Sequence, residues 1–185
     1  MLKFLVLLLF TCSLVQASSR EEAEIILQSL EKETSLVKRL ERASRIFVGL
    51  PYGKGGPLGE GTNGRYDQDP LYRFDTFDCT TYVETVISLA LAGSVEDFEM
   101  QMDRIRYENG EVDFLKRNHM PSLQWIPNNV ANGLLSEIND SIVPVKQQKV
   151  AEAMVDIGGW LRSLTPAELK VPNAKDEEKN LLIEE

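Results

Sequence analysis

The apolar residues between Phe77 and Gly93 recur at intervals of three and four, which is the spacing of one face of an α-helix. The stripe consists of Cys79, Tyr82, Val83, Val86, Ile87 and Ala90, whereas Glu84, Thr85 and Ser88 fall outside it. Asp78 precedes the stripe as a good N-cap residue, and Gly93 follows it where a helix commonly ends. The pattern therefore predicts a helix whose buried face begins with Cys79.

Three further stretches have apolar residues at helical spacing and predict helices, namely residues 21–30, 36–48 and 95–107. By contrast, residues 49–69 contain seven glycines and two prolines, which excludes a regular element. We expect this long loop to line a cleft beside the cysteine helix, because glycine permits a close backbone approach. Residues 117–129 combine polar and aromatic side chains and predict a polar loop.

The first residues have the layout of a secretory signal peptide. Lys3 precedes an apolar run over residues 4–10, and Val15-Gln16-Ala17 resembles a small-x-small cleavage site. The apolar run is too short to span a membrane, so we expect cleavage after Ala17 and export, with a periplasmic or secreted product. The predicted organisation is a signal peptide over residues 1–17, one domain over 18–172 and a charged tail over 173–185.

The charge and the residue counts limit the partners. The formal net charge is −9, and loss of Lys3 with the leader makes it −10. This balance argues against nucleic acid or an anionic membrane as the main partner. His119 and Cys79, forty positions apart, provide too few soft ligands for a metal site, and no phosphate-binding glycine loop is present. We therefore expect no metal, no cofactor and no membrane contact after cleavage.

Cys79 has two interpretations when it is considered alone. It can be a small core residue, because cysteine is among the most buried residue types. It can also be a reactive thiol, because the first turn of a helix presents unpaired N–H groups that favour a thiolate. Removal of the leader removes Cys12 and leaves Cys79 without an intramolecular disulfide partner in an oxidising compartment. A lipoprotein anchored at Cys12 is the weaker alternative, because a bulky aromatic precedes that cysteine closely.

Two segments carry a resemblance to a known superfamily. PYGKGG, which begins at Pro51, and FDCTTYV, which begins at Phe77, resemble the Tyr-x-x-Gly-Gly and Asp-Cys-Ser-Gly-x-Val signatures of NlpC-type papain-like peptidoglycan hydrolases. The closer resemblance is to the N-acetylmuramoyl-L-alanine amidase-like branch, with an FDC-x-T-Y-V-E motif and a downstream segment similar to RNHMPSLQWIPNN. The resemblance implies an α+β, papain-like fold. The sequence shows mostly the helical part of such a fold and little strand pattern, and one hypothesis is that it represents the N-terminal part of an amidase-like domain.

The resemblance also implies roles for individual residues. Cys79 would be the nucleophile that attacks an amide carbonyl, with its own backbone N–H as an oxyanion donor. Tyr52 and Asp78 would bind the amino-acid side of the scissile bond, and Thr80 is a weaker candidate for substrate binding. Asp78 has a second interpretation as a helix cap alone, which is compatible with the first.

His119 is the single histidine of the chain and a candidate catalytic base. Histidine can take the proton of a thiol and protonate a leaving nitrogen near neutral pH. In a second interpretation His119 belongs to the cleft or the loop scaffold, and the base lies elsewhere. The resemblance favours the second, because the family places its histidine at the start of a strand and Met120-Pro121 is not such a strand.

The sequence therefore predicts an exported cysteine amidase that hydrolyses the amide between N-acetylmuramic acid and L-alanine in peptidoglycan fragments. A stem-peptide endopeptidase is the alternative among enzymes. A truncated or non-catalytic muropeptide-binding protein is the alternative from another class.

Overall fold

The structure, a computed structural model, describes residues 19–53, 58–142 and 155 of the 185-residue chain. Within these residues the fold is helical. The chain forms a helix over residues 19–30, then α2 (Leu36–Ile46), α3 (Cys79–Leu91), α4 (Val95–Arg106), the 3₁₀ turns η1 (Glu108–Gly110) and η2 (Phe114–Lys116), the π-helix η3 (Pro121–Trp125), α5 (Ile126–Ala131) and α6 (Asn139–Ile142). β pairing in this part of the chain consists of two isolated bridges, Tyr52 with Phe77 and Tyr107 with Arg117.

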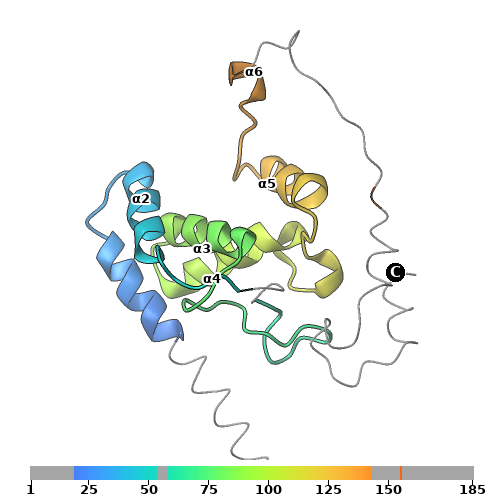
Figure 1. Cartoon of the computed structure of the whole chain (residues 1–185), viewed down its shortest axis with the longest axis horizontal. Coiled ribbons are helices and arrows are strands. Elements are labelled where there is room, and N and C mark those ends of the chain that lie inside the picture. The colour runs from blue at the N-terminus through green and yellow to red at the C-terminus, as the bar shows by residue number, and fades with distance from the viewer. Residues whose placement is uncertain (1–18, 54–57, 143–154, 156–185) are drawn as a thin grey trace, which may run out of the picture.

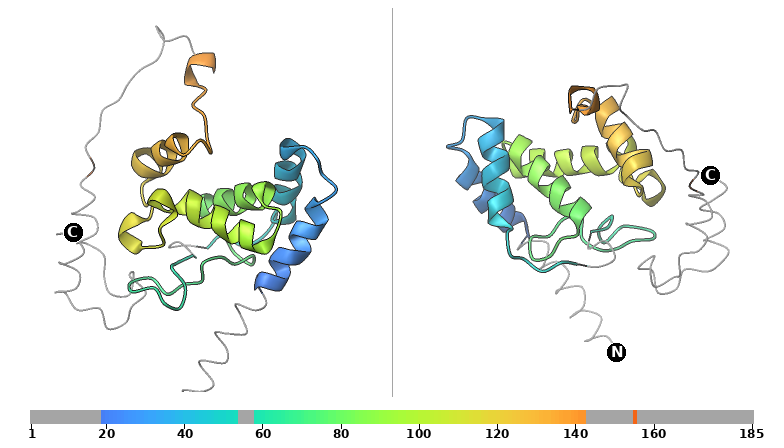
Figure 2. Two further views of the ribbon diagram at one scale, coloured as in Figure 1. Left: turned by 180° about the vertical axis from the view of Figure 1, so that it is seen from behind. Right: turned by 45° about the horizontal axis from the view of Figure 1, so that its top comes forward.

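The helix α3 lies at the centre of the described part. It packs against α2 on one side and against α4 on another. The helix over residues 19–30 and α2 lie at one end of the molecule, α5 lies at the other, and α3 and α4 lie between them (Figures 1 and 2). The nucleophile predicted from the sequence therefore lies on the element that the other helices surround.

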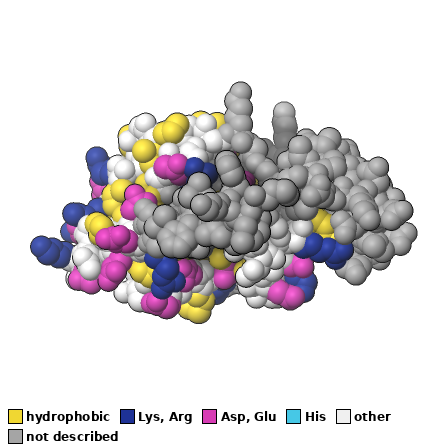
Figure 3. Space-filling model, turned by 90° about the horizontal axis from the view of Figure 1, so that it is seen from below, with side chains coloured by type: hydrophobic (Ala, Val, Ile, Leu, Met, Phe, Trp, Pro, Cys, Tyr) yellow, Lys and Arg dark blue, Asp and Glu magenta, His cyan; other side chains and the backbone are white. Residues whose placement is uncertain are grey.

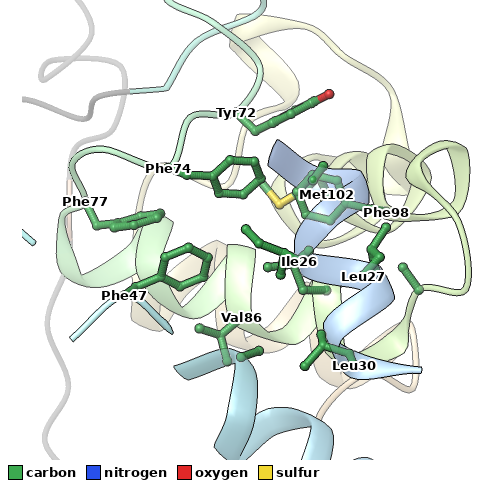
Figure 4. Close-up of a cluster of buried hydrophobic side chains, with 14 of the residues drawn as sticks. Ile26, Leu27, Leu30, Phe47, Tyr72, Phe74, Phe77, Val86, Phe98 and Met102 are labelled. Carbon is green, nitrogen blue, oxygen red and sulfur yellow. The ribbon is translucent and has the colours of Figure 1, made fainter. Parts of the chain in front are cut away.

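An aromatic cluster fills the space beside α3. The rings of Phe47 and Phe77 lie 4.9 Å apart, and those of Tyr72 and Phe98 lie 5.0 Å apart in an edge-to-face arrangement. Phe74 stacks between them, and Met102, Ile26 and Leu30 extend the cluster (Figure 4). Each fully buried side chain of this size contributes about 2 kcal/mol, so the loop before α3 is held in place by its aromatic residues.

The predicted helices over residues 21–30, 36–48 and 95–107 are confirmed, with ends that shift by one or two residues. Gly49, which follows α2, has a φ of +92°, a conformation that glycine adopts without strain. The polar loop predicted over residues 117–129 is wrong in part, because residues 121–131 form η3 and α5. Prolines at the first turn of both elements start these helices, a position where the missing N–H costs nothing.

The prediction for the buried face of α3 is confirmed for Val86 and Ala90, which are buried, and wrong for other members of the stripe. Cys79 and Val83 are exposed, whereas the residues assigned to the other face, Glu84, Thr85 and Ser88, are buried. Both α2 and α4 pack against the helix, so residues outside the apolar stripe are covered as well. Small side chains such as Thr85 and Ser88 permit neighbouring helices to approach closely, and the aromatic cluster covers the side of Val86 (Figure 4).

Two side chains close the ends of α3. Asp78 caps the N-terminus as predicted, and Arg39 of α2 reaches the C-terminus. The Arg39 guanidinium donates to the carbonyls of Ala90 at 2.6 Å and Leu89 at 3.2 Å, and also to Leu30 at the end of the preceding helix. Gly93 does not adopt a positive φ. The Arg39 guanidinium therefore caps the C-terminus of α3 and offsets the negative end of the helix dipole. The helix does not end with a glycine in the left-handed conformation.

The papain-like sheet is not among the described residues, and the α+β, papain-like fold class stays a prediction. The predicted leader lies outside the described residues, as does the predicted charged tail. No helix in the described ranges is long and apolar enough to cross a membrane. On the face shown in Figure 3, acidic and basic side chains are interspersed, so that face carries no extended field of one sign.

Candidate active site

Cys79 is the first residue of α3 and its side chain is exposed. Its Sγ atom lies 3.9 Å from Oγ1 of Thr80, the following residue. The first turn of a helix directs backbone N–H groups toward such a position, and these groups can stabilise negative charge on sulfur or on a nearby oxyanion. The structure thus presents the thiol to solvent at the end of the helix where a reactive cysteine is favoured.

Asp78 fixes the local geometry through a capping box with Thr81. Thr81 donates its backbone N–H to Oδ1 of Asp78 at 2.8 Å, and Asp78 donates its own N–H to Oγ1 of Thr81 at 2.9 Å. The capping role is therefore confirmed. These bonds use Oδ1 and not Oδ2, so the substrate-binding role of Asp78 is compatible with the cap and stays a prediction.

Tyr52 lies beside the residues that lead into α3. Gly53 donates its N–H to the Phe77 carbonyl at 2.8 Å, and Phe77 donates to the Pro51 carbonyl at 3.3 Å. Thr76 Oγ1 donates to the same Pro51 carbonyl at 3.1 Å. The Tyr52 side chain is 67% exposed. The fold therefore brings the two sequence motifs of the resemblance together, with Tyr52 paired to the residue that precedes Asp78 and Cys79.

Most of residues 58–67, in the second half of the glycine-rich loop, are buried. Gly59, Glu60, Gly64 and Asp67 are inside, and a Cβ at Gly59 would lie 2.4 Å from Oδ1 of Asp67. Arg117 holds this loop, because its guanidinium donates to Oδ2 of Asp67 at 2.9 Å and to the Leu58 carbonyl. Residues 58–67 therefore form a packed scaffold, in which glycine is required by the close approach of Asp67.

His119 is held by neighbours other than Cys79. Its Nε2 lies 2.7 Å from the Phe114 carbonyl, and its ring packs on the Phe114 ring at 4.8 Å. Burial lowers the pKa of His119 from 6.5 to about 4, and the charges of Arg117 and Arg106 act in the same direction. A carbonyl oxygen only accepts, so Nε2 must carry the proton of the neutral ring. The side chain is thus a neutral, half-buried donor at pH 7.

A buried charged group on α3 was missed by the sequence interpretation. Glu84 accepts a hydrogen bond from Nε1 of Trp125 at 3.0 Å and faces Nε of Arg106 at 3.4 Å. Burial raises the pKa of Glu84 from 4.5 to about 7, and the nearby Arg106 partly offsets this. The signal in the sequence was the place of Glu84 as the last residue of the FDC-x-T-Y-V-E motif. The motif does not show that the residue is buried, because its partners lie 22 and 41 residues away.

A cleft in the described part of the chain lies away from Cys79. It has a volume of about 400 Å³ and lies between the helix over residues 19–30 and the α3–α4 junction at residues 93–96. Because α3 has 13 residues, this junction is about 20 Å from the start of the helix. Half of its lining residues are charged, and Arg20 pairs with Glu96 across it at 2.5 Å. No group of His, Cys, Asp and Glu in the described residues is arranged to hold a metal ion.

Comparison with family models settles the affiliation of the chain. The model of an AmiA-like, N-acetylmuramoyl-L-alanine amidase-like family matches residues 42–183, which include the segments around Tyr52, Cys79 and His119. The chain belongs to this amidase-like family. No curated protein sequence matches it.

Solved structures give the same affiliation at the level of the fold. A Legionella pneumophila protein, described under the family model DUF1460, is 36% identical with a TM-score of 0.79; the match covers 92% of this chain and 57% of that one. An N-acetylmuramoyl-L-alanine amidase from Bacteroides uniformis is 21% identical with a TM-score of 0.58, over 79% of this chain and 58% of that one. The chain spans less than three fifths of either protein.

Membership of the amidase-like family confirms that part of the resemblance. The NlpC-type, papain-like assignment stays a prediction, as do the roles of the individual site residues. For an amidase-like protein, the described geometry contributes an exposed cysteine at a helix N-terminus, a capping aspartate and an exposed tyrosine beside them.

Proposed function

We propose that this amidase-like protein hydrolyses the amide between N-acetylmuramic acid and L-alanine in peptidoglycan fragments, with Cys79 as nucleophile. The observation that carries the proposal is the exposed Cys79 thiol at the first position of α3, with the Tyr52 segment paired beside it. Family membership supports the choice of bond. The activity of the whole protein and its cysteine dependence are part of this proposal.

The chemistry would proceed in two steps. The Cys79 thiolate attacks the carbonyl carbon of the muramoyl lactyl group, and the oxyanion that forms accepts hydrogen bonds from N–H groups of the first turn of α3. The C–N bond then breaks, the nitrogen of L-alanine takes a proton and leaves as an amine, and a thioester remains on Cys79. Water hydrolyses the thioester to a carboxylate and regenerates the thiol.

Tyr52, Asp78 and Thr80 would bind the substrate around this sulfur. Tyr52 is exposed and held beside Phe77, so its ring is free to contact the peptide side of the scissile bond. Asp78 retains Oδ2 outside the bonds of the capping box, which suits an amine or amide donor of the substrate. The hydroxyl of Thr80 lies 3.9 Å from Sγ of Cys79, close enough to contact the same reacting group.

His119 is either the catalytic base or a part of the loop scaffold. Its position favours the scaffold interpretation, because Nε2 donates to Phe114 and burial lowers its pKa to about 4. A base of that pKa is a weak acceptor for a thiol proton. His119 as the catalytic base is retained as the alternative and requires Nδ1 to be the accepting atom.

Export places the protein with its substrate. We infer that the leader over residues 1–17 directs the chain to the periplasm or the medium, where peptidoglycan fragments occur. The N-terminal sequence of the product released by the source cell tests this inference, and a product that still begins at Met1 would contradict it.

The decisive experiment is incubation of the protein with purified muropeptides, followed by mass spectrometry of the products. Release of free peptides that begin with L-alanine supports the proposal, and the variant Cys79→Ala should release none. Cleavage within the stem peptide would identify an endopeptidase instead. Equal cleavage by wild type and Cys79→Ala would exclude a cysteine mechanism.

A non-catalytic muropeptide-binding protein is the second candidate, favoured by the lowered pKa and the Phe114 bond of His119. Titration calorimetry with an uncleaved muropeptide distinguishes it. Saturable binding without product at high protein concentration would support the binding function, whereas turnover would exclude it.

A further inference from the structure

The geometry points to Glu84 as a positioning residue of the proposed amidase: it fixes η3, the segment that follows His119, against the nucleophile helix as a wall of the substrate site. This inference rests on the proposed function for its link to substrate, whereas the positioning itself can be tested without activity. The two oxygens of Glu84 contact different elements, so the carboxylate joins α3 to both η3 and α4.

The Glu84 carboxylate contacts Trp125 and Arg106 in the interior of the protein. Nε1 of Trp125, the last residue of η3, donates to Oε1 of Glu84 at 3.0 Å. Nε of Arg106 lies 3.4 Å from Oε2, and Arg106 also donates to the Leu71 carbonyl at 2.7 Å. Glu84, Arg106 and Trp125 are all buried. Removing one partner of such a set leaves a polar group without compensation in the interior, so the position of Trp125 depends on Glu84.

The segment that Glu84 holds has an unusual local structure. η3 is a π-helix of five residues that begins at Pro121 and has no side-chain cap at Met120. π-helical turns are rare, are seldom stable alone and occur frequently at functional sites. α5 continues directly from η3 and is tied to α4 by Asn129, whose Nδ2 donates to the Ile105 carbonyl at 3.0 Å. The bond to Glu84 therefore adds the connection to α3 that Asn129 does not make.

Glu84 is displaced from Cys79 both along and around α3. It follows Cys79 by five residues, which corresponds to a rise of about 7.5 Å along the helix and a turn of about 140° around it. A muropeptide carries sugar rings and several amino acids and is longer than this. Val83, Leu123 and Ile126 are exposed apolar residues of α3, η3 and α5, and aliphatic parts of a stem peptide suit such side chains. We therefore assign η3 to recognition of the substrate and not to the chemical step.

The charges around Glu84 make the connection sensitive to pH. Arg106 of α4 and, further away, Arg117 favour its ionised form, Trp125 donates to it, and Asp78 at the start of α3 disfavours it. Burial is the largest influence and raises the pKa to about 7. Glu84→Gln keeps an oxygen acceptor for Trp125 and removes the charge. This variant thus separates the hydrogen bond from the ion pair with Arg106.

The test compares Glu84→Ala, Glu84→Gln and Trp125→Phe with the exposed control Glu108→Ala. Five quantities are measured on the full chain: KM and kcat for muropeptide cleavage, the rate of Cys79 alkylation by iodoacetamide, hydrogen–deuterium exchange over residues 121–131, and thermal stability. We expect Glu84→Ala and Trp125→Phe to raise KM about tenfold with alkylation unchanged within about twofold. Exchange over residues 121–131 should rise in both. Glu84→Gln should restore KM and remove the pH dependence of KM between about pH 6 and pH 8.

Two results would overturn the inference. The first is unchanged exchange over residues 121–131 in Trp125→Phe, since η3 would then be held without Glu84. The second is a joint fall of kcat, of the alkylation rate and of thermal stability while KM stays constant. Glu84 would then have a structural role only. If wild type cleaves no muropeptide, the proposed function fails, and the exchange measurement still decides whether Glu84 positions η3.

Discussion

The backbone N–H of Gly53 donates to the carbonyl of Phe77 at 2.8 Å, two residues before the candidate nucleophile Cys79. This bond joins the Tyr52 motif to the Cys79 motif across more than twenty residues of chain. Together with the two bonds that the Pro51 carbonyl accepts, it joins the two segments of the candidate site.

Gly53→Pro should remove this contact, because proline has no backbone N–H. We expect a loss of about 1 kcal/mol of stability and a fall in muropeptide cleavage of about tenfold, since Tyr52 would shift relative to Cys79. Thermal unfolding and product analysis measure the two effects. Gly53→Ala keeps the N–H and is the matched control. Equal activity of both variants would show that the pairing does not position Tyr52.

Asp78→Ala should destabilise the protein by about 1 kcal/mol, because Thr81 loses the oxygen that accepts its N–H at 2.8 Å. Asp78→Asn keeps an acceptor and should retain most of the stability. Urea unfolding measures both. If Asp78 also binds substrate through its charge, Asp78→Asn should raise KM while the protein remains stable. A stable Asp78→Asn variant with unchanged KM would restrict the residue to capping.

Arg39→Ala should cost about 3 kcal/mol, because the Arg39 guanidinium donates to carbonyls at the ends of two helices. Arg39→Lys should recover only part of this, since an ammonium group cannot reproduce the planar set of donors. The control is Arg42→Ala, whose exposed pair with Glu33 at 3.6 Å should be worth less than about 1 kcal/mol. Urea unfolding that gives equal losses for positions 39 and 42 would contradict the capping role of Arg39.

Glu84→Gln should change how stability varies with pH. The folded protein holds the Glu84 proton more tightly than the unfolded chain, because burial raises the pKa from 4.5 to about 7. The Glu84 carboxyl group therefore contributes of the order of 3 kcal/mol to the free energy of unfolding below pH 4.5. This contribution is lost as pH rises through 7. Unfolding free energies of wild type and variant, measured from pH 4 to pH 8, should diverge in this window. Parallel curves would show that folding does not raise the pKa of Glu84.

His119→Gln should produce the opposite change. Burial lowers the pKa of His119 from 6.5 to about 4, so the folded protein binds this proton less tightly than the unfolded chain. The contribution of the neutral His119 ring to the free energy of unfolding is present above pH 6.5 and is lost as pH falls through 4. The variant should therefore lose less stability than wild type on acidification, as measured by thermal unfolding at each pH. A greater loss in the variant would show that His119 is protonated in the folded protein.

The sequence predicted the described helices well, because each is decided by residues a few positions apart. The periodicities of residues 21–30 and 95–107, and the capping pattern at Asp78, act through bonds within one or two turns. The segment over 121–131 was missed, because its two prolines suggest a loop unless they fall in the first turns of helices, as they do here.

The sequence by itself determined where the central helix begins, which residue caps it and that a single cysteine heads it, since these depend on local spacing and local hydrogen bonds. Only the tertiary structure decided which side of that helix meets solvent, because α2 and α4 both pack against α3 and residues outside its apolar stripe are buried as well. It also decided that Glu84 pairs with Trp125 and Arg106, that Tyr52 lies beside Phe77, and that His119 is held by Phe114. These contacts join distant parts of the chain, and packing of the whole core selects among them.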